Sequence, residues 1–358
     1  MKKLARKHKR IKEITVSKND KVYVGMDVHK KSISVAVWIN NHIELTFNSP
    51  VKYADLIEKM RSFGSALKMV TYEAGPTGYS LARAFQRASL PVQVISPSNT
   101  PRPSKRSSKT DSLDCRTLAE LSSKWLLRPV MIPTEQQEAD RQLPRLRDQL
   151  VRKRCRVRQQ IKSFLLQHGI AEPEGLTRWS CQAVMALEAL ELNSALRFTL
   201  DIYLEELALL MLQIKRVEDE LSLRAQQDPH QEAIDILTSH PGVGPVTSWS
   251  FHTEIFRPDR FEKPTEIASF LGLSPRVIQS GQSCREGPIT KSGREQLRSK
   301  LIEASWVWIR QDQQAQAVYV RLCRNTGSAN KAIVGMARRL AIHLWHMLCE
   351  KEHYHPSA

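Results

Sequence analysis

The chain lacks the features that mark a membrane or an exported protein. No run of about 18 apolar residues occurs in its 358 residues, so we expect no membrane-spanning helix. The first 12 residues hold seven Lys or Arg and no acid, and they lack the apolar stretch of a signal peptide. We therefore interpret residues 1–20 as a basic arm and expect no membrane partner.

The sequence also lacks paired cysteines. Its six cysteines are scattered, and no two form a Cys-x-x-Cys pair: Cys115, Cys155, Cys181, Cys284, Cys323 and Cys349. This spacing argues against a zinc site and against a disulfide framework. A reducing compartment suits such a chain, so we expect a cytoplasmic protein.

Acidic residues are scarce relative to basic ones. The chain has 37 Asp and Glu against 54 Lys and Arg, which gives a net charge of +17. So large a surplus repels itself unless a polyanion neutralises it, and nucleic acid is the leading partner, with an anionic membrane surface as the rival. Two basic stretches, 102–109 and 141–162, could contact DNA or RNA backbone, although each could also be a solvated surface.

The N-terminal third has a distinctive order of strand and helix patterns. We predict strands at 22–28, 32–38, 42–47, 67–72 and 91–95, and helices at 54–63 and 77–88. Asn40-Asn41 is the predicted hairpin turn between the second and third strands, and Thr77 is the predicted N-cap of the second helix. Three strands in series followed by helix, strand, helix and strand indicate a ribonuclease-H-like α/β domain, over 21–128.

The rest of the chain has helical patterns. A basic helix is predicted at 142–167, and a heptad seam follows at Leu196, Leu200, Tyr203, Leu207, Leu210, Ile214, Val217 and Leu221. The seam can pack within the chain as a hairpin or join two protomers, and we favour oligomerisation. We assign 129–230 to this basic helix and coiled-coil segment.

A mainly helical domain is expected over 231–350. Its Gly-rich turn at 241–247 suits a helix-hairpin-helix element, whose backbone N–H groups contact a phosphate, or else a plain interhelical turn. We predict a loop at 279–287 and closing helices at about 295–308 and 331–348.

Four carboxylates carry the chemistry that the sequence suggests. Asp27 ends the first strand, Glu73 follows the fourth, and Asp111 and Asp114 lie three apart at the start of a helix. On this scaffold they could meet at one sheet edge and bind magnesium, which prefers oxygen ligands and stabilises charge on a transferring phosphoryl group. Alternatively, Asp27 caps a turn, and the two helical acids only complement the helix dipole.

Seven motifs together carry a resemblance. They are Gly25-Met26-Asp27-Val28-His29-Lys30, the run from Tyr72 to Gly78, Lys109-Thr110-Asp111-x-x-Asp114, and the stretches 241–247, 270–275, 280–281 and 287–293. In this order they resemble the DEDD transposases of the insertion-sequence family numbered one hundred and ten. Cys115 and Arg294 depart from the family pattern, which usually has Ala and Asn at those positions.

The resemblance implies an RNA-guided recombinase that moves an insertion sequence between DNA sites. It implies a RuvC-like N-terminal domain, a coiled coil, a C-terminal transposase domain and a homo-oligomer, either dimer or tetramer. The matched positions make Asp27, Glu73, Asp111 and Asp114 a tetrad for magnesium, with manganese as the alternative metal. They make Ser280 the nucleophile that links covalently to donor or target DNA. Without the resemblance, Ser280 would be interpreted as a turn residue.

Two other hypotheses remain open at this stage. In one, the chain is a RuvC-like nuclease that hydrolyses DNA through an activated water, and Ser280 is only structural. In the other, it is a non-enzymatic protein that binds nucleic acid through its arm, its basic helix and the turn at 241–247.

Overall fold

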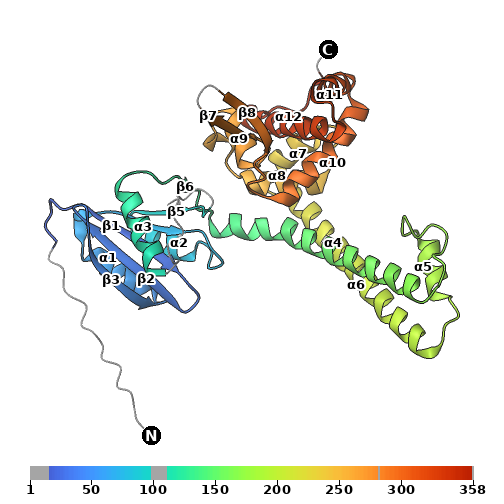
Figure 1. Cartoon of the computed structure of the whole chain (residues 1–358), viewed down its shortest axis with the longest axis horizontal. Helices are drawn as coiled ribbons and strands as arrows, with labels where there is room; N and C mark the ends of the chain where they lie inside the picture. Colours follow the sequence, from blue (N-terminus) through green and yellow to red (C-terminus); the bar gives the residue numbers. More distant parts are fainter. Residues whose placement is uncertain (1–15, 98–110, 281–282, 357–358) are drawn as a thin grey trace, which may run out of the picture. The chain divides into compact units, whose positions relative to one another are not determined.

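The computed structural model describes residues 16–97, 111–280 and 283–356 (Figure 1). It divides into two compact units, Met1–Glu135 and Gln136–Ala358. Most of the basic arm predicted at 1–20 and the whole basic stretch 102–109 lie outside the described residues. Among the described helices, none is long and apolar enough to cross a membrane.

A six-stranded mixed sheet forms the first unit. The strands lie in the order β3-β2-β1-β4-β5-β6. β1 pairs antiparallel with β2 and parallel with β4, and β5 continues the parallel half. The strands are β1 (Val22–Val28), β2 (Ser32–Ile39), β3 (His42–Pro50), β4 (Leu67–Glu73), β5 (Val92–Ile95) and β6 (Pro129–Val130). This mixed sheet with helices is consistent with the predicted ribonuclease-H-like fold.

The turn between β2 and β3 is the predicted one. Asn40 and Asn41 have φ angles of 44° and 75°, and the flanking Ile39 pairs with His42. Asn tolerates these left-handed angles better than most residues, and two such residues in succession match the twist of the flanking strands.

Helices cover both faces of this sheet. α1 (Tyr53–Arg61) and α2 (Ser80–Arg87) pack on one face, where Met26 and Tyr72 are fully buried. α3 (Asp111–Ser123) covers the opposite face. The predicted N-cap Thr77 is wrong: the chain makes another turn, in which the Gly78 N–H donates to the Gly75 carbonyl, before α2 begins after Tyr79.

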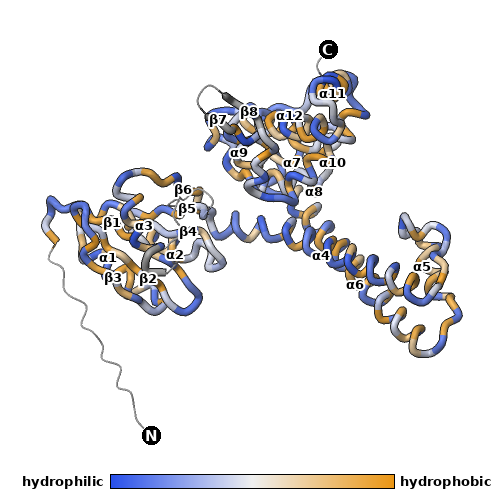
Figure 2. Tube along the Cα trace, viewed as in Figure 1, coloured by the Kyte–Doolittle hydropathy of each residue, from blue (hydrophilic) through white to orange (hydrophobic). Residues whose placement is uncertain are grey.

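A long helical hairpin opens the second unit. α4 (Glu135–Gln167) and α6 (Ser194–Ala225) lie side by side, joined through the short α5 (Cys181–Glu188) (Figure 1). α4 begins seven residues before the predicted helix at 142 and passes through Pro144. Figure 2 shows the start of α4 largely hydrophilic and α6 largely hydrophobic.

The heptad seam of α6 packs inside the hairpin. Leu200, Leu207 and Leu210 are buried in one cluster with Leu150, Val157 and Ile161 of α4. The expectation that this seam joins protomers is therefore corrected, because α4 of the same chain already covers it.

The remainder of the second unit is mainly helical. Its helices are α7 (Gln231–Thr238), α8 (Pro245–Ile255), α9 (Pro264–Phe270), α10 (Glu295–Gln311), α11 (Gln313–Thr326) and α12 (Ala329–Glu350). α12 provides much of the core, with Ala337, Leu340 and Leu344 fully buried. The segment 279–287, predicted as a loop, instead contributes to an antiparallel hairpin of β7 (Pro275–Ser280) and β8 (Ser283–Ile289), because backbone pairing overrides its polar composition.

Candidate active site

Two of the four predicted carboxylates lie at the carboxyl ends of neighbouring parallel strands, Asp27 as the second-last residue of β1 and Glu73 as the last of β4. Met26 of β1 pairs with Tyr72 of β4, so the residues that follow them, Asp27 and Glu73, are side by side at one edge. Since successive side chains alternate between the faces of a sheet, both acids lie on the face opposite the buried Met26 and Tyr72. That is the face covered by α3.

Gly25 sets how closely α3 approaches this edge. A Cβ added at Gly25 would lie 2.0 Å from the carbonyl oxygen of Cys115 and 2.6 Å from the backbone nitrogen of Ala119. The helix backbone therefore occupies the space that any other residue at position 25 would fill. Further along α3, the Thr71 hydroxyl donates to the Ser122 hydroxyl at 2.9 Å, which fixes the helix on β4 as well.

The first turn of α3 brings the remaining two acids toward the same edge. Asp114 is half-buried and immediately precedes Cys115, whose backbone packs on Gly25. Burial and, to a lesser degree, the nearby charge of Asp27 raise the pKa of the Cys115 thiol to about 11. Asp27 is thus close enough to the start of α3 to act on it electrostatically. Asp111 begins the helix, but its side chain is outside the described part of the structure.

His29 is a neighbour that the sequence analysis did not single out. Its Nε2 lies 3.1 Å from Oδ2 of Asp27, and both side chains are open to solvent, at 47% and 23% exposure. The signal was present in the motif at 25–30, where an imidazole follows the aspartate by two residues.

Ser280 lies in the other unit. It is the last residue of β7 and pairs with Ser283 of β8, and its side chain is not among those described. The motifs at the base of this hairpin pack together: a Cβ on Gly272 would lie 2.1 Å from the Ser292 carbonyl oxygen, and Arg298 donates to that carbonyl at 2.8 Å. The structure thus places Asp27 and Glu73 side by side and Asp114 next to Cys115, whose backbone packs on Gly25, while Ser280 belongs to the second unit.

Comparison with known proteins agrees with this arrangement. A DEDD transposase model of the IS110 type matches residues 24–170, and the model of the transposase family IS116/IS110/IS902 matches residues 234–320. A Sinorhizobium fredii protein named as the transposase y4qE is 30% identical over 80% of this chain and 71% of its own length.

This chain belongs to the IS110/IS116/IS902 family of transposases. Its match to the transposase of element IS1111A from Coxiella burnetii is 25% identical over 94% of this chain and 92% of the relative. The transposase of element IS1533 from Leptospira borgpetersenii is 29% identical over 80% of this chain and 85% of the relative. The protein is accordingly a DNA-processing enzyme that moves insertion sequences.

A DEDD transposase domain implies a divalent metal ion. The donor chemistry suits such an ion, because Asp27 and Glu73 would supply hard oxygen ligands side by side at this edge. Among the side chains that the structure describes, no group of three or more His, Cys, Asp or Glu is arranged as a metal site. The side chain of Asp111 lies outside that set.

Proposed function

We propose that this transposase cuts and rejoins DNA with Asp27, Glu73, Asp111 and Asp114 as a magnesium-binding tetrad and Ser280 as the nucleophile. Manganese is the alternative metal. The observation that carries the proposal is the adjacency of Asp27 and Glu73 on the face covered by α3. We assign the RuvC-like catalytic domain to 21–128, the coiled-coil segment to 129–230 and the transposase domain to 231–350.

In the proposed chemistry the four carboxylates and Ser280 have different roles. The carboxylates would hold the metal, which when bound supplies positive charge beside the reacting phosphate. The Oγ of Ser280 bonds to phosphorus as one P–O bond of the DNA breaks, and the displaced DNA oxygen leaves as a hydroxyl with the proton that Ser280 has lost. The energy of that bond is kept in the protein–DNA ester, so a DNA hydroxyl can later displace Ser280 and reseal the strand.

A covalent adduct is the direct test. The full chain would be incubated with magnesium, the RNA from the element's non-coding end, and labelled donor and target DNA, then denatured and examined for DNA attached to protein. Ser280→Ala should abolish the adduct. Ser283→Ala is the matched control, because Ser283 pairs with Ser280 across the hairpin and should leave the adduct intact. Cut DNA without an adduct would instead favour the hydrolytic nuclease.

We also propose that a guide RNA binds this protein. The net charge of +17 and the basic residues of α4 support a polyanionic partner beyond the DNA itself. The turn before α8 supports a further phosphate contact, since no side chain caps that helix after Gly244. Purification from cells that carry the whole element should yield bound RNA, and its absence would contradict the proposal.

A homo-oligomer, dimer or tetramer, is proposed through the outer face of α6. Four apolar side chains on this face are 46–68% exposed and spaced by four, seven and three residues: Phe198, Ile202, Leu209 and Leu212. This spacing is typical of a coiled-coil seam, so a second copy of α6 is the partner that we expect. Leu209→Glu together with Leu212→Glu should reduce the mass measured by light scattering, while Arg321→Glu, at an exposed position of α11, should not.

A further inference from the structure

Four arginines surround one buried carboxylate in the second unit. We call Arg141, Arg145, Arg260 and Arg294 the arginine cluster. Arg145 donates to Oε1 of Glu254 through two nitrogens, at 2.8 and 3.0 Å, and Arg294 donates to the same oxygen at 3.1 Å. The Nε of Arg141 lies 3.6 Å from the other oxygen, and Arg260 reaches the Glu254 main-chain carbonyl at 3.4 Å.

One carboxylate does not neutralise this cluster. Burial lowers the pKa of Arg145 despite its contact with Glu254, and the charges of Arg294 and Arg141 lower it further. Burial and the charge of Arg141 lower the pKa of Arg260 to about 10. The Arg260 Nε is buried and has no hydrogen-bond partner among the described residues. The cluster therefore holds more positive charge than the carboxylate of Glu254 offsets.

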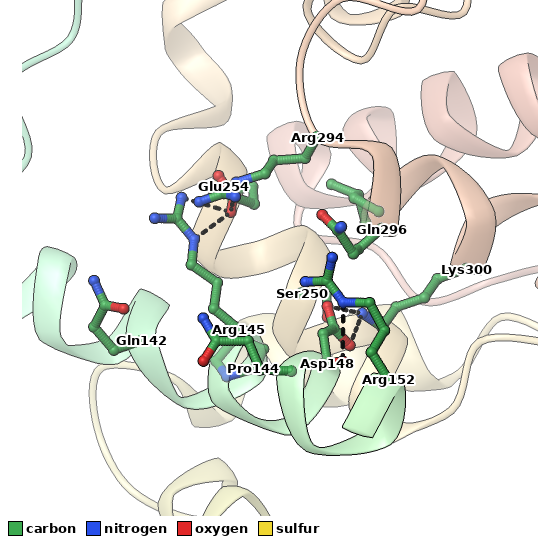
Figure 3. Close-up of a pocket in the computed structure, with 12 residues that line it drawn as sticks. Gln142, Pro144, Arg145, Asp148, Arg152, Ser250, Glu254, Arg294, Gln296 and Lys300 are labelled. Atoms are coloured by element: carbon green, nitrogen blue, oxygen red, sulfur yellow. Dashed lines mark hydrogen bonds and ion pairs between the residues drawn. The ribbon is translucent and has the colours of Figure 1, made fainter. Parts of the chain in front are cut away.

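The surplus charge borders a small crevice. The space is about 220 Å³ and is enclosed by α4, α8 and α10. Figure 3 shows Arg145 and Arg294 converging on Glu254, with Lys300 and Arg152 around Asp148. Lys300 donates to both oxygens of Asp148, at 2.5 and 2.6 Å. The charged residues that line the crevice are four cations, Arg145, Arg152, Arg294 and Lys300, and two acids, Asp148 and Glu254.

The start of α10 adds donors to the same space. Arg294 is the N-cap residue of this helix, and no side chain caps it. Gln296 and Leu297, in its first turn, line the crevice. The first N–H groups of a helix have no partner within the helix and carry a partial positive charge, which favours an anion.

We propose that this crevice binds a phosphate of a nucleic-acid backbone, and that Glu254 takes the place of that phosphate in the free protein. The inference rests on the proposed function only in taking nucleic acid as the partner. A volume of about 220 Å³ is small beside the roughly 300–1,000 Å³ of drug-sized ligand pockets, but it suits a single phosphate. A guanidinium can bind a phosphate through two parallel hydrogen bonds. Arg145 already presents two nitrogens on one side of its guanidinium, Nε and Nη2, to a single oxygen of Glu254.

The competing interpretation is a purely structural clamp that joins α4 to α8 and α10. Substitution of Arg294 can distinguish the phosphate site from the structural clamp. This residue lies at the rim, with 42% of its side chain exposed, and Arg145 and Arg141 contact Glu254 without it.

The test measures binding of the full-length protein to two probes over a range of salt concentrations. The probes are a labelled transcript of the element's non-coding end and a labelled DNA duplex of the element end. Arg294→Gln should weaken binding about three- to tenfold and reduce the slope of log affinity against log salt by about one. The matched control is Arg216→Gln, an equal loss of charge at an exposed position on α6.

If Arg294→Gln loses affinity for the transcript alone, the bound phosphate belongs to RNA. If it loses affinity for the duplex alone, the phosphate belongs to DNA. Wild-type affinity in Arg294→Gln, an equal loss in Arg216→Gln, or no binding of either probe by the wild type would overturn the inference. Glu254→Gln, shown to be folded by circular dichroism, should bind the sensitive probe several-fold more tightly, and unchanged or weaker binding would refute the role of Glu254. Because binding needs no strand cleavage, failure of the adduct experiment would leave this result standing.

Discussion

The acidic edge of the first unit and the arginine cluster of the second both gather like charges, but they are held differently. Asp27 and Glu73 are placed by the ends of two paired strands. The arginines converge on one residue, Glu254, through their side chains. An acid at the edge can therefore lose its charge without loss of the fold, whereas the cluster depends on its carboxylate. Carboxylates that the backbone positions, such as Asp27 and Glu73, are available for catalysis. Arginines that are grouped around a counterion, as they are around Glu254, also contribute to the stability of the fold.

The largest effect is expected for Asp27→Asn. Strand exchange should fall about a thousandfold or more, because several kcal/mol of metal-dependent stabilisation depend on this carboxylate. The melting temperature should stay within a few degrees of wild type, since the change removes one of several like charges. Asp55→Asn, at an exposed position of α1, is the control for loss of one acid. Full exchange by Asp27→Asn would rule out the proposed tetrad.

Glu254→Gln, unlike Asp27→Asn, should act mainly on stability. The free energy of unfolding should fall by about 3–5 kcal/mol in chemical denaturation, because four arginines lose the carboxylate that offsets their charge. The exposed ion pair of Arg257 and Asp259 is the comparison, and Asp259→Asn should cost much less. Equal stability of Glu254→Gln and wild type would show that the cluster does not depend on its acid.

Gly25→Ala tests whether the close approach of the α3 backbone to β1 is needed for the function of Asp27 and Glu73. The added methyl would overlap the backbone of α3, so unfolding should become easier by about 3 kcal/mol, and strand exchange should fall although no acid has changed. Gly75→Ala is a matched control for stability, since the nearest atom to its added Cβ is 4.0 Å away. A Gly25→Ala protein with normal stability would mean that α3 can move away from β1.

Acid should weaken the second unit through two buried histidines. Burial lowers the pKa of His240 and of His252 to about 4, against about 6.5 in an unfolded chain. Between these values the unfolded state binds more protons, so stability decreases as the pH falls from about 6.5 to 4, by about 1–3 kcal/mol per histidine. Denaturation at pH 7 and pH 5 should show the decrease, and His252→Gln should reduce it. A His252→Gln protein that keeps the full decrease would assign the pH dependence to other groups.

Local pattern was enough to predict much of the sheet. β1 is found at its predicted bounds, and the Asn40-Asn41 turn follows from a backbone preference of those two residues. The hairpin of β7 and β8 could not be predicted in this way, since Gln279 and Ser280 have the composition of a loop and become strand only by pairing with Cys284 and Ser283. α11 was also missed, because its apolar face is short and is completed by α12.

The sequence by itself determined the charge surplus, the order of the first five strands along the chain and the choice of the four candidate acids, because each depends on residue type and local spacing. Only the tertiary structure decided that the seam of α6 faces α4 rather than another chain, and that Arg294 meets Glu254 forty residues away. Both are contacts between segments distant in sequence. Several segments of the chain could offer a given helix a similar apolar surface or an opposite charge. Which of them it contacts is decided only when the whole unit packs.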